Sequence, residues 1–271
     1  MSMRRGWVVA GSGAAAVLVV AAGLAGLWRW DASRDPQVRD SVAVMDRGVA
    51  DVLVAAGDDA AVAVSGMVRA ATCPLGVLRG GGRYTRAADL YVPGGDEESV
   101  LSGIEQRLPA SYQPRRETAL SGSTRPLVAE AGAGVELSVR QLGPGWLVAQ
   151  AQTGCVAGPS DPVEASPAPG DPAASAIRDV LTALGTTPAG FNTASLPCQG
   201  AKAGGQIVTV AGVSVSTDSG RLADRVPVPP QARAFAVAAS NRVAYRDGPV
   251  SVVADASDDG TAVTVRRTTV C

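Results

Sequence analysis

The sequence predicts an α+β protein in which an N-terminal transmembrane helix precedes two similar small modules, each built from a helix, an antiparallel sheet and a closing hairpin. Three observations predict this arrangement. Residues 7–28 contain no charged side chain. Two later segments with a helical repeat of apolar residues are each followed by stretches that alternate apolar and polar residues. The chain has four cysteines, all after residue 28, which predicts one disulfide in each module.

The uncharged run 7–28 is long enough to cross a bilayer, because at about 1.5 Å rise per residue it spans about 33 Å. Tryptophans bracket the run, where amphipathic rings prefer the headgroup layers. Arg4 and Arg5 precede it, so the positive-inside rule keeps residues 1–6 in the cytoplasm and places the remaining chain outside. We therefore expect a retained single-pass anchor in the cell membrane.

Two other leader types compete with the anchor. Gly23 and Ala25 have the spacing of a signal-peptide cleavage site after Ala25, but the apolar run exceeds the usual length of a signal h-region. Lipoprotein processing is disfavoured because Leu27 occupies the position that the acylated cysteine would need. A mature N-terminus at Gly26 would replace the anchored protein with a secreted one.

The first predicted module covers residues 36–156. Apolar residues at three- and four-residue spacing predict a helix from Pro36 to Gly57, with proline and glycine at its two ends. An extended stretch is expected at 83–92, and a second helix at 96–108, whose first turn is acidic and so complements the helix dipole. Alternation from Val135 onward, a Gly-Pro-Gly turn at 143–145 and a return strand predict a hairpin that ends at Cys155.

The second predicted module, residues 173–271, repeats this order after a proline-rich linker at 157–172 that we interpret as the domain boundary. A helix is expected from Pro172 to Gly185, an extended stretch at 206–216 and a short second helix around 218–225. A hairpin with its turn at 258–260 closes the module at Cys271. The turn glycine precedes the closing cysteine by similar distances in both modules, which indicates an internal duplication.

The repeated plan favours disulfides Cys73–Cys155 and Cys198–Cys271 over the other two pairings. Disulfides in a small exported protein suit an oxidising compartment. The competing interpretation is four buried thiols in a cytosolic protein, against which the transmembrane segment argues. The cysteines form no C-x-x-C pair and the chain has no histidine, so we expect no zinc site and no other metal or cofactor.

Composition excludes several functions. The 24 basic and 25 acidic residues are interspersed, which argues against nucleic-acid binding. Without histidine, a Ser-His or Cys-His catalytic pair is ruled out, and neither a nucleophile elbow nor a phosphate-binding P-loop occurs, so we do not expect an enzyme. Acidic runs at 58–59, 96–98 and 258–259 suit calcium binding or acid–base catalysis by type, but their positions favour turn and capping roles.

Two further features are candidates for binding. A candidate anion site for wall polymer or lipid headgroups is formed by arginines, with an ordinary solvated face as the alternative. Its residues are Arg79, Arg83, Arg86, Arg115 and Arg116. Trp146 begins a strand directly after a turn, where it would either stack on a ligand or cover one end of the core.

Layout and composition together resemble those of actinobacterial single-pass envelope proteins, with a short cytoplasmic end, one helix, a secreted tail, and arginine used almost to the exclusion of lysine. The resemblance spans the whole length and carries no functional motif. We expect a membrane-anchored extracytoplasmic protein that binds a partner protein or wall component without catalysis. The alternatives are a sensor or accessory subunit of a membrane complex and, less favoured, a carboxylate-based envelope hydrolase.

Overall fold

A computed structural model describes residues 35–76, 79–118, 124–159, 165–198, 205–215, 222–235, 241–257 and 261–271. The predicted membrane segment 7–28 lies outside the described residues. Within the described ranges, no helix has both the length and the apolar character needed to span a bilayer.

The first module is an antiparallel sheet covered by helices. Its strands are β1 (Ala61–Val64), β2 (Val68–Gly76), β3 (Arg79–Tyr91), β4 (Arg115–Arg116), β5 (Leu127–Gly132), β6 (Val135–Gly143) and β7 (Trp146–Thr153). They lie in the order β1-β3-β7-β6-β5-β4, with β2 also paired to β3. Its helices are α2 (Val38–Ala56) and α3 (Glu97–Arg107), as predicted.

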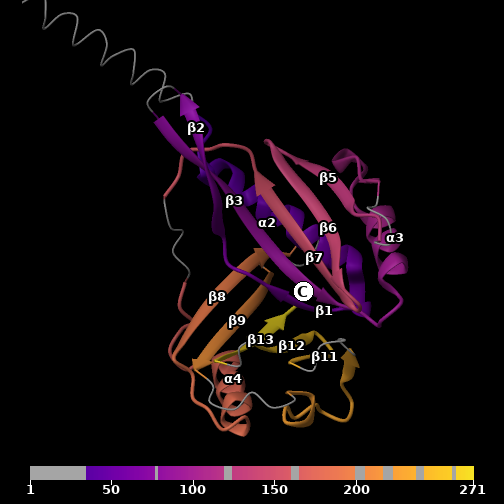
Figure 1. The fold of residues 1–271 in the computed structure, drawn as a ribbon, viewed down its shortest axis with the longest axis vertical. Coiled ribbons are helices and arrows are strands. Elements are labelled where there is room, and N and C mark those ends of the chain that lie inside the picture. The colour runs from indigo at the N-terminus through magenta and orange to yellow at the C-terminus, as the bar shows by residue number, and fades with distance from the viewer. Residues whose placement is uncertain are drawn as a thin grey trace, which may run out of the picture.

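The second module is an antiparallel sheet with one helix, α4 (Pro172–Ala183), as predicted. Its strands are β8 (Gly190–Pro197), β9 (Gln206–Val215), β10 (Arg233–Phe235), β11 (Arg242–Asp247), β12 (Val250–Ala256) and β13 (Ala262–Thr269), in the order β10-β11-β12-β13-β9-β8. Figure 1 shows the orange and yellow strands of this sheet below the purple and pink strands of the first.

Both modules use the same strand order. Reading from β2, the first sheet runs β2-β3-β7-β6-β5-β4, and reading from β8, the second runs β8-β9-β13-β12-β11-β10. Two differences separate them. The first module has the extra strand β1, and where it has α3, the described part of the second has only a 3-10 turn, Leu222–Asp224. That turn lies within the helix expected around 218–225, of which residues 218–221 are outside the described ranges.

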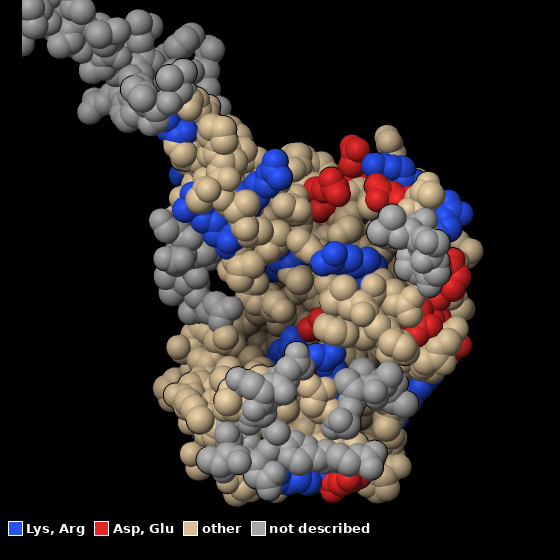
Figure 2. Space-filling model, viewed as in Figure 1, with Lys and Arg blue, Asp and Glu red and all other residues tan. Residues whose placement is uncertain are grey.

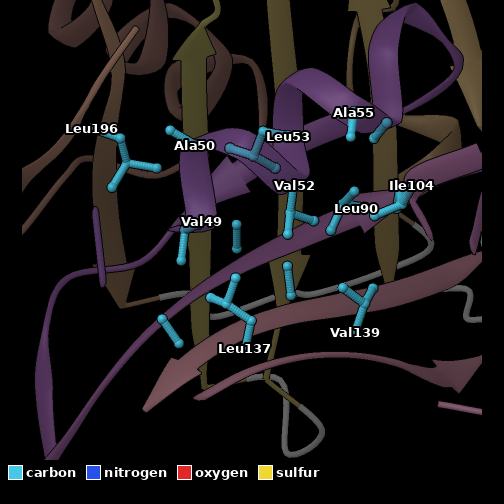
Figure 3. Close-up of a cluster of buried hydrophobic side chains, with 14 of the residues drawn as sticks. Val49, Ala50, Val52, Leu53, Ala55, Leu90, Ile104, Leu137, Val139 and Leu196 are labelled. Atoms are coloured by element: carbon cyan, nitrogen blue, oxygen red, sulfur yellow. The ribbon is translucent and has the colours of Figure 1, made fainter. Parts of the chain in front are cut away.

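Helix α2 packs its apolar face on the first sheet, as its residue spacing predicts. Figure 3 shows Val49, Val52 and Leu53 of α2 among side chains of the strands, including Leu90 and Leu137. Leu196 and Ile207 of the second sheet belong to the same core cluster, because α2 also contacts β8. The first core therefore extends into the second module.

Both main helices end at a glycine whose backbone has a positive φ. Gly57 follows α2 with φ 70° and Gly185 follows α4 with φ 77°, a conformation that favours glycine. At its start, α4 is capped by the Asp171 carboxylate, which accepts a hydrogen bond from the Ala173 N–H at 2.7 Å. The start and stop signals in the sequence therefore placed these helices correctly.

Two disulfides, Cys73–Cys155 and Cys198–Cys271, close the modules, which confirms the predicted pairing. The bridged Cα atoms lie 6.0 Å and 5.9 Å apart. The first bridge joins Cys73 on β2 to the chain after β7, and the second joins Cys198, directly after β8, to the chain after β13. Two such bridges indicate an oxidising, extracytoplasmic location.

Candidate functional site

The two sheets meet through strand β1, whose four residues are all buried. Val62 and Val64 belong to the core beneath α2, whereas Ala61 and Ala63 belong to a second cluster that joins the modules. The partners of these alanines include Phe235, Ala244 and Val253 of the second sheet. The alanines carry small side chains, which suits close approach of the two sheets.

A closed chain of polar contacts, here called the junction ring, lies beside β1. Arg266 Nη1 donates to Asp89 Oδ2 at 2.6 Å, and its Nη2 lies 3.8 Å from Asp255 Oδ2. Asp255 accepts three hydrogen bonds from Arg242 at 3.0–3.1 Å. The guanidinium of Arg242 covers the Trp146 ring, and Trp146 Nε1 donates to Asp89 Oδ1 at 3.0 Å, which closes the ring.

Strand register brings these side chains together. Arg242 and Asp255 are direct cross-strand partners on β11 and β12. Tyr91 and Trp146 are partners on β3 and β7, and their rings stack with centroids 6.3 Å apart. Because side chains alternate across a strand, Asp89 lies on the same face as Tyr91. The ring therefore joins two strands of the first sheet, β3 and β7, to three strands of the second, β11, β12 and β13.

Burial and charge shift the pKa values of two groups here. Burial raises the pKa of the Tyr91 hydroxyl, and the neighbouring Asp89 carboxylate raises it further, against the opposing effect of Arg266 and Arg242. For Arg266, burial alone would lower the pKa of the guanidinium, but Asp89 and other neighbours outweigh it and raise that pKa. Arg266 is therefore held in its charged form.

A second group of contacts crosses the junction at the turn after α2. Arg246 of β11 donates to the carbonyl oxygens of Gly57 at 2.9 Å and Ala60 at 3.0 Å, and it pairs with Asp58 at 2.5 Å. Arg233 pairs with Asp59 at 3.1 Å. The acidic pair 58–59 therefore links the modules.

A cavity of about 260 Å³, here called the junction cavity, lies beside Arg266. It is open to solvent on one side and is lined by the end of β1, by the chain that follows it, and by strands β8, β9, β12 and β13. Its lining residues are Val64, Ser65, Gly66, Asn192, Thr193, Ala194, Thr209, Ala211, Val213, Asp255, Thr264 and Arg266. Hydroxyl, amide, carboxylate and guanidinium residues thus share the wall with apolar ones, which suits the binding of a small polar molecule.

The five arginines of the predicted anion site do not form one cluster. Three lie on β3 and two on β4, and three other strands separate β3 from β4 in the sheet. Arg79 pairs with Asp35, Arg86 pairs with Asp46 at 2.9 Å, and Arg116 pairs with Glu98 and Glu105. Arg115 lies 4.0 Å from Glu130, and Arg83 is exposed.

The charged residues of the segment that forms the β2–β3 ribbon are nevertheless all positive. Residues 60–88 include four arginines and no acidic residue. In Figure 2, basic side chains without acidic ones appear on the ribbon at the upper left, whereas the two signs lie together elsewhere on this face. On β3, exposed Arg83 remains a candidate for anion binding, whereas Arg79 and Arg86 are engaged by Asp35 and Asp46 and the arginines of β4 belong to a mixed, paired surface.

The acidic run 96–98 acts at a helix start, as expected. Glu97 accepts hydrogen bonds from the backbone N–H groups of Gly95 at 2.9 Å and Gly145 at 2.6 Å. Burial alone would raise the pKa of Glu97, but these backbone hydrogen bonds outweigh it and lower that pKa. The run 258–259 lies outside the described ranges, and within them no group of His, Cys, Asp or Glu side chains could hold a metal ion.

Trp146 lies at the junction, half-buried between Tyr91 and Arg242. Its ring therefore covers one end of the apolar cluster that joins the two modules. The guanidinium of Arg242, from the second module, occupies the ring face that a stacking ligand would use. Sequence reasoning missed Asp89, Arg242, Asp255 and Arg266. The available signal was one face of β11–β13 that is mainly polar, with apolar Ala244 and Val253 among its residues.

Comparison with known proteins found no matching family model, no matching curated protein and no matching solved structure.

Proposed function

We propose that this protein is a bacterial envelope protein, held in the membrane by residues 7–28, whose two modules lie outside the cell and bind a partner without catalysis. The observation that carries the proposal is that both disulfides join cysteines located after the uncharged run. Export of everything after that run accounts for the disulfides and for the absence of charge within it.

A binding role is supported by the chemistry of the junction. Asp89 and Asp255 both contact guanidinium groups, so neither is a free carboxylate of the kind a glycoside hydrolase needs. The chain also has no histidine to act as a general base. What the junction offers instead is a polar cavity between two rigidly packed modules, which favours binding over hydrolysis.

The β2–β3 ribbon would lie close to the membrane in this arrangement. Arg79 at its end pairs with Asp35, only seven residues after Trp28. Seven extended residues reach at most about 25 Å, so the ribbon would lie within that distance of the end of the anchor. Exposed Arg83 would then face the headgroup layer or the anionic wall polymer next to it.

The anchor and its orientation are tested by fractionation and protease treatment. Tagged full-length protein should remain in the membrane after alkaline extraction, and protease added to spheroplasts should remove a C-terminal tag. Edman sequencing of the purified protein should give the uncleaved N-terminal sequence. A mature N-terminus at Gly26, or a tag protected from protease in intact spheroplasts, would contradict the anchored orientation.

The binding role is tested by photocrosslinking in cells. A crosslinking amino acid is placed at exposed Val68 on β2, at exposed Val54 on α2, or as a matched control at buried Val253. Mass spectrometry should identify one reproducible product from an exposed position and none from Val253. A membrane-complex protein would make this chain an accessory subunit, and wall material would make it a polymer-binding protein. Absence of any product at both exposed positions would contradict a stable partner there.

A further inference from the structure

The start of the first module is fastened to the β2–β3 ribbon. The Ala157 N–H donates to the Pro36 carbonyl at 2.8 Å, and the Val38 N–H donates to the Ala157 carbonyl at 2.8 Å. The entering chain therefore pairs with the chain that follows β7. Asp35 pairs with Arg79 of β3, and these two side chains are only 14% and 12% exposed. The point at which the chain enters the module is thus held against the ribbon.

The ribbon is tied to the same place through both of its strands. Gly82 of β3 and Val156 exchange two backbone hydrogen bonds, of 2.9 Å and 3.0 Å. The Cys73–Cys155 disulfide joins β2 to the residue before Val156. The segments joined in this way form one unit, here called the proximal platform, which consists of residues 35–38, 68–76, 79–83 and 154–159.

The position of the proximal platform in the chain places it at the membrane, given the proposed anchor at residues 7–28. The seven-residue step from Trp28 to Asp35 reaches at most about 25 Å. Figure 1 shows the β2–β3 ribbon projecting from the first module at the opposite end of the molecule from α4. The ribbon therefore forms the end of the molecule that faces the bilayer.

The charge of the proximal platform is complementary to an anionic lipid layer. Its residues include three arginines and one aspartate, so its formal charge is +2. Asp35 is engaged by Arg79, whereas neither Arg69 nor Arg83 pairs with a carboxylate among the described residues. Arg83 is exposed, and Figure 2 shows basic side chains without acidic ones on the ribbon. Each basic side chain near an anionic membrane surface strengthens binding about fivefold.

The exposed surface of β2 favours lipid over a soluble anionic polymer. In the described structure β2 pairs only with β3, so it is an edge strand. Exposed edge strands usually carry charged side chains. The exposed residues of β2 are instead all uncharged, namely Val68, Ala70, Ala71, Thr72, Pro74 and Gly76. A headgroup layer would cover this apolar edge as well as match the arginines, whereas a polymer would leave the edge in water.

We propose that the proximal platform docks on anionic lipid headgroups at the outer face of the membrane, so that the β2–β3 ribbon lies against the bilayer and α4 points away from it. This inference rests on the proposed anchor and deepens it. The anchor gives attachment, and the docked ribbon adds a second contact that sets the orientation of both modules.

The test is photocrosslinking of the full-length protein in nanodiscs. A crosslinking amino acid is placed at exposed Thr72 on β2 or, as a control, at exposed Asp179 on α4. In discs of phosphatidylglycerol and phosphatidylcholine, peptide mass spectrometry should find lipid adducts at Thr72 and none at Asp179. The Thr72 yield should fall severalfold in pure phosphatidylcholine and at high salt, because the surface charge is removed or screened. Absence of a lipid adduct at Thr72, or equal yields at both positions, would overturn the proposal.

Matched arginine variants separate docking from simple tethering. R83Q removes the exposed charge of the proximal platform, whereas R140Q removes an exposed charge from β6, elsewhere in the same sheet. R83Q should lower the Thr72 adduct yield about two- to fivefold, and R140Q should leave it unchanged. Equal yields from the two variants would mean that the anchor alone brings β2 to the lipid, which would overturn docking by charge.

Two controls keep the outcomes distinct. If the crosslinking amino acid at Thr72 prevents the neighbouring Cys73–Cys155 bridge, which non-reducing peptide mapping reports, exposed Val68 carries it instead. A protein adduct at Thr72 in cells, in place of lipid, would assign the β2 edge to a partner strand and overturn the proposal. Fractionation and protease treatment do not depend on the ribbon. A protein that passes them but gives no lipid adduct therefore retains the proposed function and loses only this inference.

Discussion

The guanidinium carbon of Arg242 on β11 lies 4.0 Å from the centroid of the Trp146 ring on β7. This contact joins the two sheets through a cation and an aromatic face, and Asp89 and Asp255 hold the two side chains from either side. Since the ring is largely shielded from water, the contact contributes more than an exposed cation–π pair would. The junction is therefore a stabilising interface.

Removing the Trp146 side chain should destabilise the protein. W146A loses the stacking on Tyr91, the Arg242 contact and the hydrogen bond to Asp89, and we expect a loss of about 2–4 kcal/mol in the free energy of unfolding. W146F keeps a ring and should lose less. Urea unfolding of the full-length protein in detergent, followed by circular dichroism, measures both. Identical midpoints for W146A and the wild type would contradict a structural role for the junction ring.

Arg266 should matter far more than its neighbour Arg267. R266M leaves Asp89 buried without its cation, which should reduce the free energy of unfolding by about 3–5 kcal/mol. Arg267 points to the opposite face of β13 and forms only a long contact with Thr269, so R267M should change it by less than about 1 kcal/mol. Urea midpoints of the two variants compare them directly. Equal losses would mean that the side chain of Arg266 acts only through general packing.

Two helix glycines should respond oppositely to alanine. A Cβ at Gly48 in α2 would lie 2.7 Å from buried Leu137 Cδ2, so G48A should cost about 1–3 kcal/mol through overpacking. A Cβ at Gly103 in α3 would meet only the end of the flexible, exposed Arg107 side chain, so G103A should gain up to about 1 kcal/mol from helix propensity. Thermal unfolding of both variants provides the comparison. A stabilised G48A would show that Leu137 has room to move.

Glu97 should contribute stability that is lost in acid. Its pKa is lowered in the folded protein, so the folded state favours the carboxylate and its contribution is complete above the ordinary Glu value of 4.5. As pH falls below that value and through the lowered pKa, the contribution disappears. The free energy of unfolding of E97Q, measured from pH 7 to pH 2, should therefore fall less steeply than that of the wild type. Parallel curves would contradict the role of the Gly95 and Gly145 hydrogen bonds.

Each disulfide should stabilise its module by a similar amount. The bridges close loops of 82 and 73 residues, and the chain-entropy model gives about 4 kcal/mol for either. The double variants C73S/C155S and C198S/C271S should therefore show comparable losses in the free energy of unfolding. Denaturant unfolding measures both losses. As a control, reductant should not change the unfolding of a variant that carries all four cysteine-to-serine substitutions. A much smaller loss in one module would indicate residual structure in its unfolded chain.

Much of the fold was predictable because its signals are local. The helices 38–56, 97–107 and 172–183 follow from apolar spacing and end residues, and both closing hairpins follow from alternation and turn residues. The order of these elements relative to the cysteines then gave the disulfide pairing. By contrast, β1 has only four residues, all apolar and all buried, so it lacks the alternation that identifies a strand. Strand β2 is largely exposed and has two irregularities in its register, one beside Pro74.

The junction was not predictable because its residues have the pattern of a solvated face. In β11 the arginines 242 and 246 share one face and Val243 and Tyr245 the other, and in β13 Thr264 and Arg266 lie opposite Val263 and Val265, which normally indicates one exposed and one buried face of a sheet. Here the first module covers this face. Arg246 contacts the Gly57 carbonyl and Arg266 pairs with Asp89, both in the first module. Arg242 pairs with Asp255 of its own sheet and lies over the Trp146 ring of the first module. Only the three-dimensional placement of Asp58, Asp89 and Asp255 distinguishes this arrangement from an exposed face.

Strand β1 also determines how many modules can stack. The interface is heterologous, because β1 of the first module contacts the sheet of the second, and the described part of the second module has no strand equivalent to β1 that contacts the first. A heterologous contact between similar units can be repeated without limit, as in solenoid arrays. The second module, however, has no strand between α4 and β8, where residues 184–189 are fully described. The second module therefore has no counterpart of the surface that β1 presents in the first, so the two modules contact each other through unlike elements.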